Sequence, residues 1–184
     1  GVKMKIRMAA VIASAMALVV SGVEAQAGRG VELGLDAGVA IGLGDNSVTV
    51  ISIPAQAFRA GFPMTDRVSI EPKLGLNIIT GDGDTFSSYR AEVGALYHLS
   101  PRADRMRSGV YVRPFAGLTG FSAGDDSNGN SVGDTNGLLG VGLGLKVALL
   151  NRLSSRFEAN FAGTFGDESN SQVGLLAGLS FFTR

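Results

Sequence analysis

The charged residues with the most regular spacing stand in segments where every second side chain is large and apolar. Glu71 lies two positions before Lys73, and Arg90 lies two positions before Glu92. Acids and bases gathered on one face could act in general acid–base catalysis, line a path for ions, or neutralise one another as ion pairs. Five acidic and five basic residues share the pattern: Glu32, Asp36, Glu71, Lys73, Arg90, Glu92, Arg113, Lys146, Arg156 and Glu158.

The elements that carry these residues are predicted to be strands, because a period of two places successive side chains on opposite faces. The pattern is clearest over residues 31–43, where all seven odd positions are apolar and the even positions are Glu, Gly, Asp, Gly, Ala and Gly. A face of glycine and isolated charge suits the crowded inside of a narrow barrel, and the aliphatic face suits lipid outside.

Turn-forming residues divide the chain into eight such segments. We expect strands over residues 31–43, 47–60, 67–79, 86–98, 109–121, 137–149, 154–165 and 171–182. Eight alternating segments with short connections predict an all-β fold, an eight-stranded antiparallel up-and-down transmembrane barrel. The connection from Gly124 to Asn136 is predicted to be the longest loop.

The connections differ in charge according to the end of the barrel at which they lie. Those at one end hold no Lys or Arg, only Asp45, Asp82, Asp84, Asp125, Asp126, Asp134, Asp167 and Glu168. The connections and chain ends at the other side hold Arg29, Arg67, Arg102, Arg105, Arg107, Arg152 and Arg184. With both termini in the periplasm, the acidic group faces outward.

The first 27 residues have the pattern of a secretory signal peptide. Lys3, Lys5 and Arg7 precede an apolar run over residues 8–20, and Ala25-Gln26-Ala27 supplies a small-residue cleavage site. The run is shorter than the roughly 20 residues of a membrane-spanning helix. We therefore expect residues 1–27 to be removed and residues 28–184 to form the barrel domain in the outer membrane of a diderm bacterium. The chain has no cysteine, which excludes disulfides and thiol chemistry.

Eight alternating strands behind an export signal resemble the small outer-membrane barrel superfamily that includes the transmembrane domain of outer membrane protein A and the adhesion/invasion barrels. The last segment, from Val173 to Phe182, is similar to the C-terminal signal of that superfamily, in which alternating apolar residues end in an aromatic. The resemblance implies that the barrel-assembly machinery reads Phe181 and Phe182. It also implies surroundings of outer-membrane lipid and lipopolysaccharide, with the protein as a monomer. The chain departs from the pattern in carrying Thr183-Arg184 after the aromatics and in having no Trp.

Two functions stay open for the barrel interior. An eight-stranded barrel is just wide enough to be filled by its own side chains, and buried charges are costly unless paired. Five acids facing five bases therefore predict a closed, ion-paired lumen and a structural, membrane-integrity or surface-interaction role, with Glu71 and Glu92 as partners of Lys73 and Arg90. The alternative is a small pore or transporter for ions, small solutes or apolar molecules. A soluble periplasmic barrel is disfavoured by the aliphatic face of nearly every strand.

Other kinds of site find little support. The single histidine, His98, stands beside the periplasmic turn, where an interfacial or turn-capping role is expected, so no catalytic residue is predicted. Counted from Asp126, an EF-hand loop would need Gly and Glu where the chain has Ser131 and Gly137. No metal or cofactor is predicted, although the outward carboxylates could bind divalent cations that also bridge lipopolysaccharide. The chain has no basic stripe for nucleic acid.

Arg59 departs from the pattern. Simple alternation over residues 47–60 turns Ile51, Ile53, Ala55 and Ala57 toward lipid, and Arg59 with them. Its long side chain could then reach the lipid headgroups. A β-bulge in this segment is the alternative.

Overall fold

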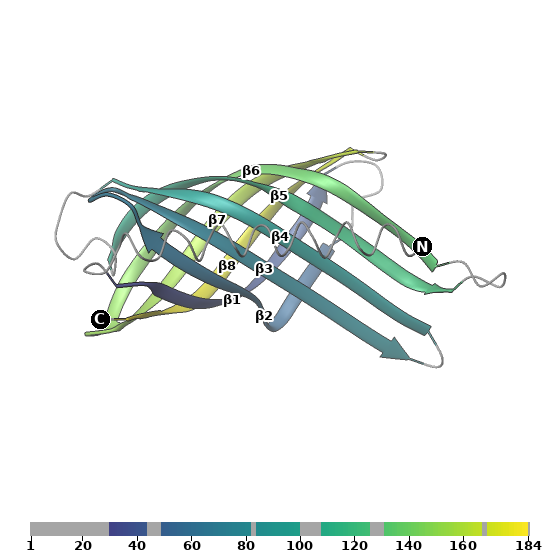
Figure 1. Cartoon of the computed structure of the whole chain (residues 1–184), viewed down its shortest axis with the longest axis horizontal. Helices are drawn as coiled ribbons and strands as arrows, with labels where there is room; N and C mark the ends of the chain where they lie inside the picture. The colour runs from purple at the N-terminus through teal and green to yellow at the C-terminus, as the bar shows by residue number, and fades with distance from the viewer. Residues whose placement is uncertain are drawn as a thin grey trace.

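The computed structural model describes residues 30–43, 49–81, 84–99, 108–125, 131–166 and 169–183. These residues form eight strands: β1 (Glu32–Leu43), β2 (Thr49–Pro63), β3 (Val68–Gly81), β4 (Asp84–His98), β5 (Gly109–Asp125), β6 (Ser131–Leu150), β7 (Leu153–Phe165) and β8 (Asn170–Phe182). Each strand pairs antiparallel with the next, and β8 pairs with β1, so the sheet is a closed barrel (Figure 1). The predicted fold class is confirmed. The described residues contain no helix that is both long and apolar enough to cross a membrane.

Closure leaves the sheet with no free edge, so backbone donors and acceptors find partners within the barrel. The two ends of the described chain meet where the barrel closes: the Thr183 N–H donates to Val31 O at 2.8 Å, and the Val31 N–H donates to Thr183 Oγ1 at 2.6 Å. We call this the terminal end of the barrel. The opposite end, toward which the β3–β4 and β5–β6 hairpins extend in Figure 1, is the loop end.

Alternation along the strands separates an apolar outside from a polar inside. In β6 the exposed apolar residues are Leu139, Val141, Leu143, Leu145 and Val147, whereas Gly142, Gly144 and Lys146 between them are buried. Leu33 and Leu35 of β1 are likewise exposed, with Glu32 and Asp36 buried. The lumen is therefore the only interior of the described barrel, and the charged residues occupy it.

The strands at the loop end are longer than predicted. The prediction of a loop from Gly124 to Asn136 is wrong for most of these residues, because β5 continues to Asp125 and β6 starts at Ser131. Backbone pairing carries on through polar residues there, with Phe121 opposite Asp134. The hydroxyls of Tyr89 and Thr135 hydrogen-bond near the same level. Residues with turn propensity are thus held in a strand by the neighbouring strand.

β2 contains a register shift. Asp36 pairs with Ala57 and Gly38 pairs with Ser52, so two steps along β1 match five along β2, which leaves three extra residues in β2. An odd insertion reverses the side-chain alternation. Ala57 and Arg59 therefore lie on the inward face, beside Asp36 and Gly34, so simple alternation is wrong here and the alternative, a β-bulge in this segment, is confirmed. The side chains of Ile51, Ile53 and Ala55, and all of residues 1–29, lie outside what the structure describes.

Candidate functional site

Near the terminal end of the lumen, Arg59 of β2 joins two carboxylates of β1. Its Nη1 lies 2.5 Å from Glu32 Oε1, and its Nε lies 3.0 Å from Asp36 Oδ1. Arg59 Nη2 donates to Ser180 Oγ at 2.6 Å, and Lys146 Nζ donates to Glu32 Oε2. The Arg59 side chain is fully buried, so it is an internal ion-pair partner and does not reach toward lipid. Arg59 points inward because of the three extra residues in β2.

Glu71 of β3 stands where arginines from three strands converge. Its Oε2 lies 2.5 Å from Arg156 Nη1 and 3.6 Å from Arg59 Nη1, and its Oε1 lies 4.0 Å from Arg113 Nε. Glu71 is fully buried. The pairing of Glu71 with Lys73 expected from the sequence is therefore wrong. A guanidinium on a long side chain reaches across a narrow barrel, so opposite strands supply the partners.

A second carboxylate, Glu158 of β7, binds its neighbours through both oxygens. Arg113 Nη2 lies 2.7 Å from Glu158 Oε1, and Arg156 Nη2 lies 2.6 Å from Glu158 Oε2. The Tyr111 hydroxyl donates to Glu158 Oε2 at 2.9 Å and accepts from Arg156 Nε at 2.5 Å. Arg113 Nη1 continues the network to Glu92 Oε1 at 2.7 Å. One connected set of charge-assisted bonds thus crosses the barrel.

The remaining two bases face the loop end. Lys73 Nζ lies 3.1 Å from Asp36 Oδ2, and Arg90 Nε donates to Glu92 Oε2 at 2.8 Å. The Arg90 side chain is 30% exposed, whereas that of Glu92 is 1% exposed. Of the pairs predicted from the sequence, Arg90 with Glu92 is present. Lys73 pairs instead with a carboxylate of β1.

Uncharged side chains are buried among and beside these ion pairs. They include Leu96, His98, Tyr111, Ser154 and Ser180. Gly144 makes room for Tyr111, because a Cβ on Gly144 would overlap the phenol ring. His98 is buried inside the barrel with its ring centroid 6.1 Å from that of Tyr111, so the expected interfacial placement is wrong. Its position on the inward face of β4, in step with Leu96, is the reason.

The arrangement keeps the carboxylates occupied. Each of the five has an Arg or Lys nitrogen within 3.0 Å, so the described lumen holds no free carboxylate for general base catalysis. No group of three or more His, Cys, Asp or Glu residues among the described residues could hold a metal ion. Of the acidic connections, Asp45, Asp82, Asp126, Asp167 and Glu168 lie outside the described residues.

Sequence reasoning overlooked two members of the network. Arg59 was left between a lipid-facing position and a β-bulge, since nothing in the sequence marks the length of the insertion in β2. Tyr111 could have been found, because it alternates in step with Arg113 and so shares its face. With Arg59 included, the ion-pair network of the described residues contains six basic and five acidic residues.

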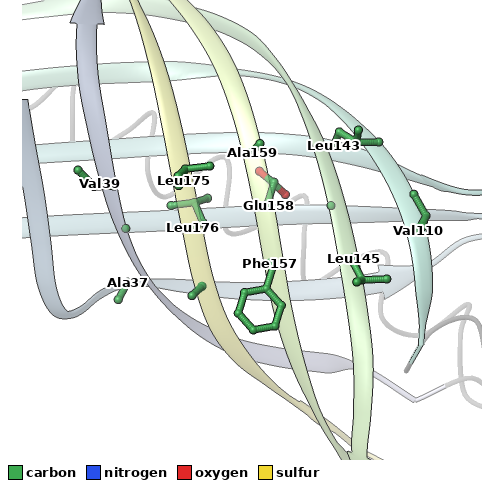
Figure 2. A pocket seen from close by; sticks show the side chains of 13 residues that line it. Ala37, Val39, Val110, Leu143, Leu145, Phe157, Glu158, Ala159, Leu175 and Leu176 are labelled. Carbon is green, nitrogen blue, oxygen red and sulfur yellow. The ribbon is translucent and has the colours of Figure 1, made fainter.

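The outer wall carries an apolar hollow on the β1, β5, β6, β7 and β8 side (Figure 2). In Figure 2, Phe157 and Glu158 are neighbours on β7, yet Phe157 is exposed on the outside and Glu158 is buried in the network. The apolar lining consists of Ala37, Val39, Val110, Leu143, Leu145, Phe157, Ala159, Leu175, Leu176 and Ala177. The sheet is therefore a single layer between apolar surroundings and the ion pairs.

The predicted assembly residues lie at the end of β8. Phe181 is exposed and pairs with Leu33 of β1 and Leu153 of β7. Phe182 pairs with Glu32, and its ring centroid lies 6.0 Å from Lys146 Nζ. One aromatic ring thus belongs to the outer surface, and the other borders the lumen.

Comparison with known proteins finds the same architecture in other barrels. The model of the outer membrane protein beta-barrel domain family matches residues 8–181. Neisserial surface protein A has the same fold at 16% identity and a TM-score of 0.58, over 83% of this chain and 97% of that chain. The attachment invasion locus protein Ail of Yersinia pestis is 11% identical with a TM-score of 0.54, over 84% and 99%.

A second structure of Ail, in complex with the heparin analogue sucrose octasulfate, has a TM-score of 0.50 at 11% identity, over 84% of this chain and 97% of that chain. A search of curated proteins found no match. The structural likenesses, all at low identity, concern the fold. The family match spans nearly all of the chain and agrees with a closed barrel that is apolar outside and ion-paired inside. The chain belongs to the outer membrane protein beta-barrel domain family and is a protein of the outer membrane.

Proposed function

We propose that this chain is a closed outer-membrane barrel with a structural role, in membrane integrity or surface interactions, and that its lumen does not conduct. The observation that carries the proposal is the position of Glu71. Its side chain is fully buried where arginines of β2, β5 and β7 converge. Any path through the barrel would have to separate these pairs.

Opening such a network is costly. Each buried ion that loses its partner raises the free energy of the barrel by roughly several kcal/mol. The terminal half is also filled by Leu96, His98 and Tyr111, all buried. These side chains lie in series with the ion pairs, so rearranging one salt bridge would not create a continuous passage.

A pore or transporter is the rival function. A passage for apolar molecules needs a continuous apolar inner wall, whereas buried ion pairs cross the described lumen and its buried apolar side chains, such as Phe115 and Leu138, form only a small cluster. A passage for ions needs a gap in the terminal half, where Tyr111 and Arg156 are buried against one another. Both requirements favour the closed barrel.

Conductance across a planar bilayer tests the proposal. The full barrel, with insertion checked by its heat-dependent gel mobility, is expected to give no current steps. A Tyr111→Ala/Arg156→Ala variant, which removes two large side chains from the terminal half, is expected to conduct and shows that the assay can detect an opened lumen. Discrete steps from the wild-type barrel would make transport the function.

A structural role has a second consequence. Cells that lack the protein are expected to become more sensitive to detergent and EDTA, and the wild-type gene should restore resistance. If the Tyr111→Ala/Arg156→Ala variant also restores resistance, the contribution of the barrel to membrane integrity does not depend on a closed lumen.

A surface interaction, if the barrel makes one, should differ from that in the sulfated-ligand complex of Ail. The outward connections expected in this chain hold carboxylates and no Lys or Arg. A polyanion would be repelled by such a surface, whereas cations would be attracted. We therefore favour divalent cations that bridge these carboxylates to the phosphates of lipopolysaccharide, with the protein as a monomer.

Phe181 and Phe182 are proposed as the signal for the barrel-assembly machinery. β8 closes the barrel by pairing with β1, and these residues end that strand. Replacing Phe182 by Ala is expected to lower the yield of folded barrel in proteoliposomes that contain the machinery. Phe165→Ala is the control, because Phe165 is an exposed aromatic at the loop end of β7. Equal yields from both variants would refute the assignment.

A further inference from the structure

The loop half of the lumen contains a cavity of about 270 Å³, and its lining combines aliphatic residues with neutral polar ones. Gly38 and Ala40 of β1 and Leu176 of β8 contribute only backbone and aliphatic carbon. Asn160 of β7 and Gln172 of β8 contribute side-chain amides. A water molecule occupies about 30 Å³ of liquid, so the cavity has room for several waters or one small organic molecule.

The charged residues that line this cavity are already paired with one another. Lys73 Nζ lies 3.1 Å from Asp36 Oδ2, and Arg90 Nε lies 2.8 Å from Glu92 Oε2. An ion that entered would have to compete with these pairs, whereas an uncharged molecule would leave them intact. The connections expected at the loop end are acidic, so they also repel anions before they reach the cavity. Both observations favour an uncharged occupant.

Asn160 brings to the cavity a buried amide that has no hydrogen-bond partner among the described residues. Only 8% of the residue is exposed. Its partners on the neighbouring strands are glycines, Gly142 on β6 and Gly174 on β8, so neither supplies a side chain to bond with. Burying an amide without a hydrogen bond is unfavourable. A polar molecule is therefore expected in the space beside Asn160.

The chemistry of this amide suits hydroxyl groups. Asn160 offers an NH₂ donor and a carbonyl acceptor, and a hydroxyl can both accept and donate. The amide lies against Gly174, because a Cβ there would stand 2.7 Å from Asn160 Oδ1. Gln172 is two residues from Gly174 on the same face of β8 and adds a second amide. Two amides beside aliphatic residues match a molecule that has several hydroxyls and C–H groups between them.

We propose that this cavity, which we call the loop-end vestibule, binds a small uncharged polyhydroxyl molecule, such as a single sugar ring, held by the amides of Asn160 and Gln172. Its hydroxyls supply the hydrogen bonds that Asn160 lacks, and its C–H groups lie against Ala40 and Leu176. The ligand enters from the loop end and stops at the ion-pair network, so binding needs no passage through the barrel. The inference goes beyond the proposed structural role and holds whether or not the lumen conducts.

The test uses D-glucose as the probe and the full refolded barrel in a detergent without a sugar headgroup, because a glucoside or maltoside could occupy the same cavity. Titration calorimetry is expected to show saturable binding to one site. The affinity should change little when sodium chloride is added, since an uncharged ligand has no charge to screen. A parallel titration with dephosphorylated core oligosaccharide of lipopolysaccharide tells whether the vestibule prefers a membrane-bound sugar or a free one.

Three variants locate the site. Asn160→Leu keeps a side chain of similar size and removes its donor and acceptor, so it is expected to weaken glucose binding by about tenfold or more. Gly174→Ala removes no polar group, but its Cβ would displace the Asn160 amide, so it should also weaken binding. Asn151→Ala is the matched control, since Asn151 is an exposed amide in the turn at the terminal end and its loss should leave glucose binding unchanged.

Three outcomes would overturn the proposal. Absence of saturable glucose binding in the wild type would leave water as the occupant of the vestibule. Equal affinity in the wild type and the Asn160→Leu variant would place the sugar elsewhere on the barrel. Displacement of glucose by inorganic phosphate at constant ionic strength would show that the cavity selects anions. Folding of each variant is checked by heat-dependent gel mobility, and Asn160→Leu breaks no hydrogen bond among the described residues.

Discussion

The two halves of the lumen are built from the same strands, yet they differ in how their interior is filled. Toward the terminal end, Arg59, Tyr111 and Lys146 are buried. Toward the loop end, Gly75 and Gly174 line a cavity of about 270 Å³. Since the same eight strands form both halves, the size of the inward side chains decides which half is closed.

Glycine has opposite consequences in the two halves. In the terminal half a glycine stands against a large neighbour, as Gly144 does against Tyr111 and Gly34 against the Arg59 guanidinium. There it permits close packing. In the loop half Gly75 borders open space, so it leaves the interior empty. A glycine-rich inward face therefore does not by itself indicate a pore, because the size of the residue opposite each glycine determines whether the space is filled.

The largest expected effect comes from removing the central charge of the closed half. Glu71→Gln leaves Arg59 and Arg156 without their shared partner, and we expect it to lower the free energy of unfolding by roughly 3–5 kcal/mol. Urea unfolding of the barrel in lipid vesicles measures the change. An unchanged midpoint would show that these ion pairs do not hold the terminal half together.

A smaller effect is expected from adding one methyl group to each half. Gly144→Ala places a Cβ against the Tyr111 ring and should cost about 1–3 kcal/mol through overpacking. Gly75→Ala, its counterpart beside the cavity, should cost clearly less in the same unfolding assay. Equal costs would mean that the two halves do not differ in packing.

The smallest effect is expected at the edge of the network. Arg90 is partly exposed, and Glu92 keeps Arg113 when Arg90 is lost. Arg90→Gln should therefore change the free energy of unfolding by less than about 1 kcal/mol, as for an exposed ion pair. A loss as large as that of Glu71→Gln would show that ion pairs stabilise the loop half as strongly as the terminal half.

Side-chain alternation in the sequence is enough to predict where the strands lie and most of the residues that face inward. A period of two assigns Glu32 and Asp36 to one face however the rest of the chain folds, because neighbouring side chains in a strand must point to opposite sides. The same local rule placed Arg113 and Lys146. The loop assignment failed at Asp134, where the partner strand extends pairing into residues that favour turns.

Which charges meet depends on how the strands pair around the closed barrel. Lys146 and Glu32 are 114 positions apart in the chain, and Arg156 and Glu71 are 85 apart, so barrel closure and the relative register of the strands bring them together. Arg59 turns inward because pairing with β1 takes up three extra residues in β2. These contacts depend on strand register across the barrel, which alternation within one strand does not encode, and they decide that one half of the lumen is closed while the other stays open.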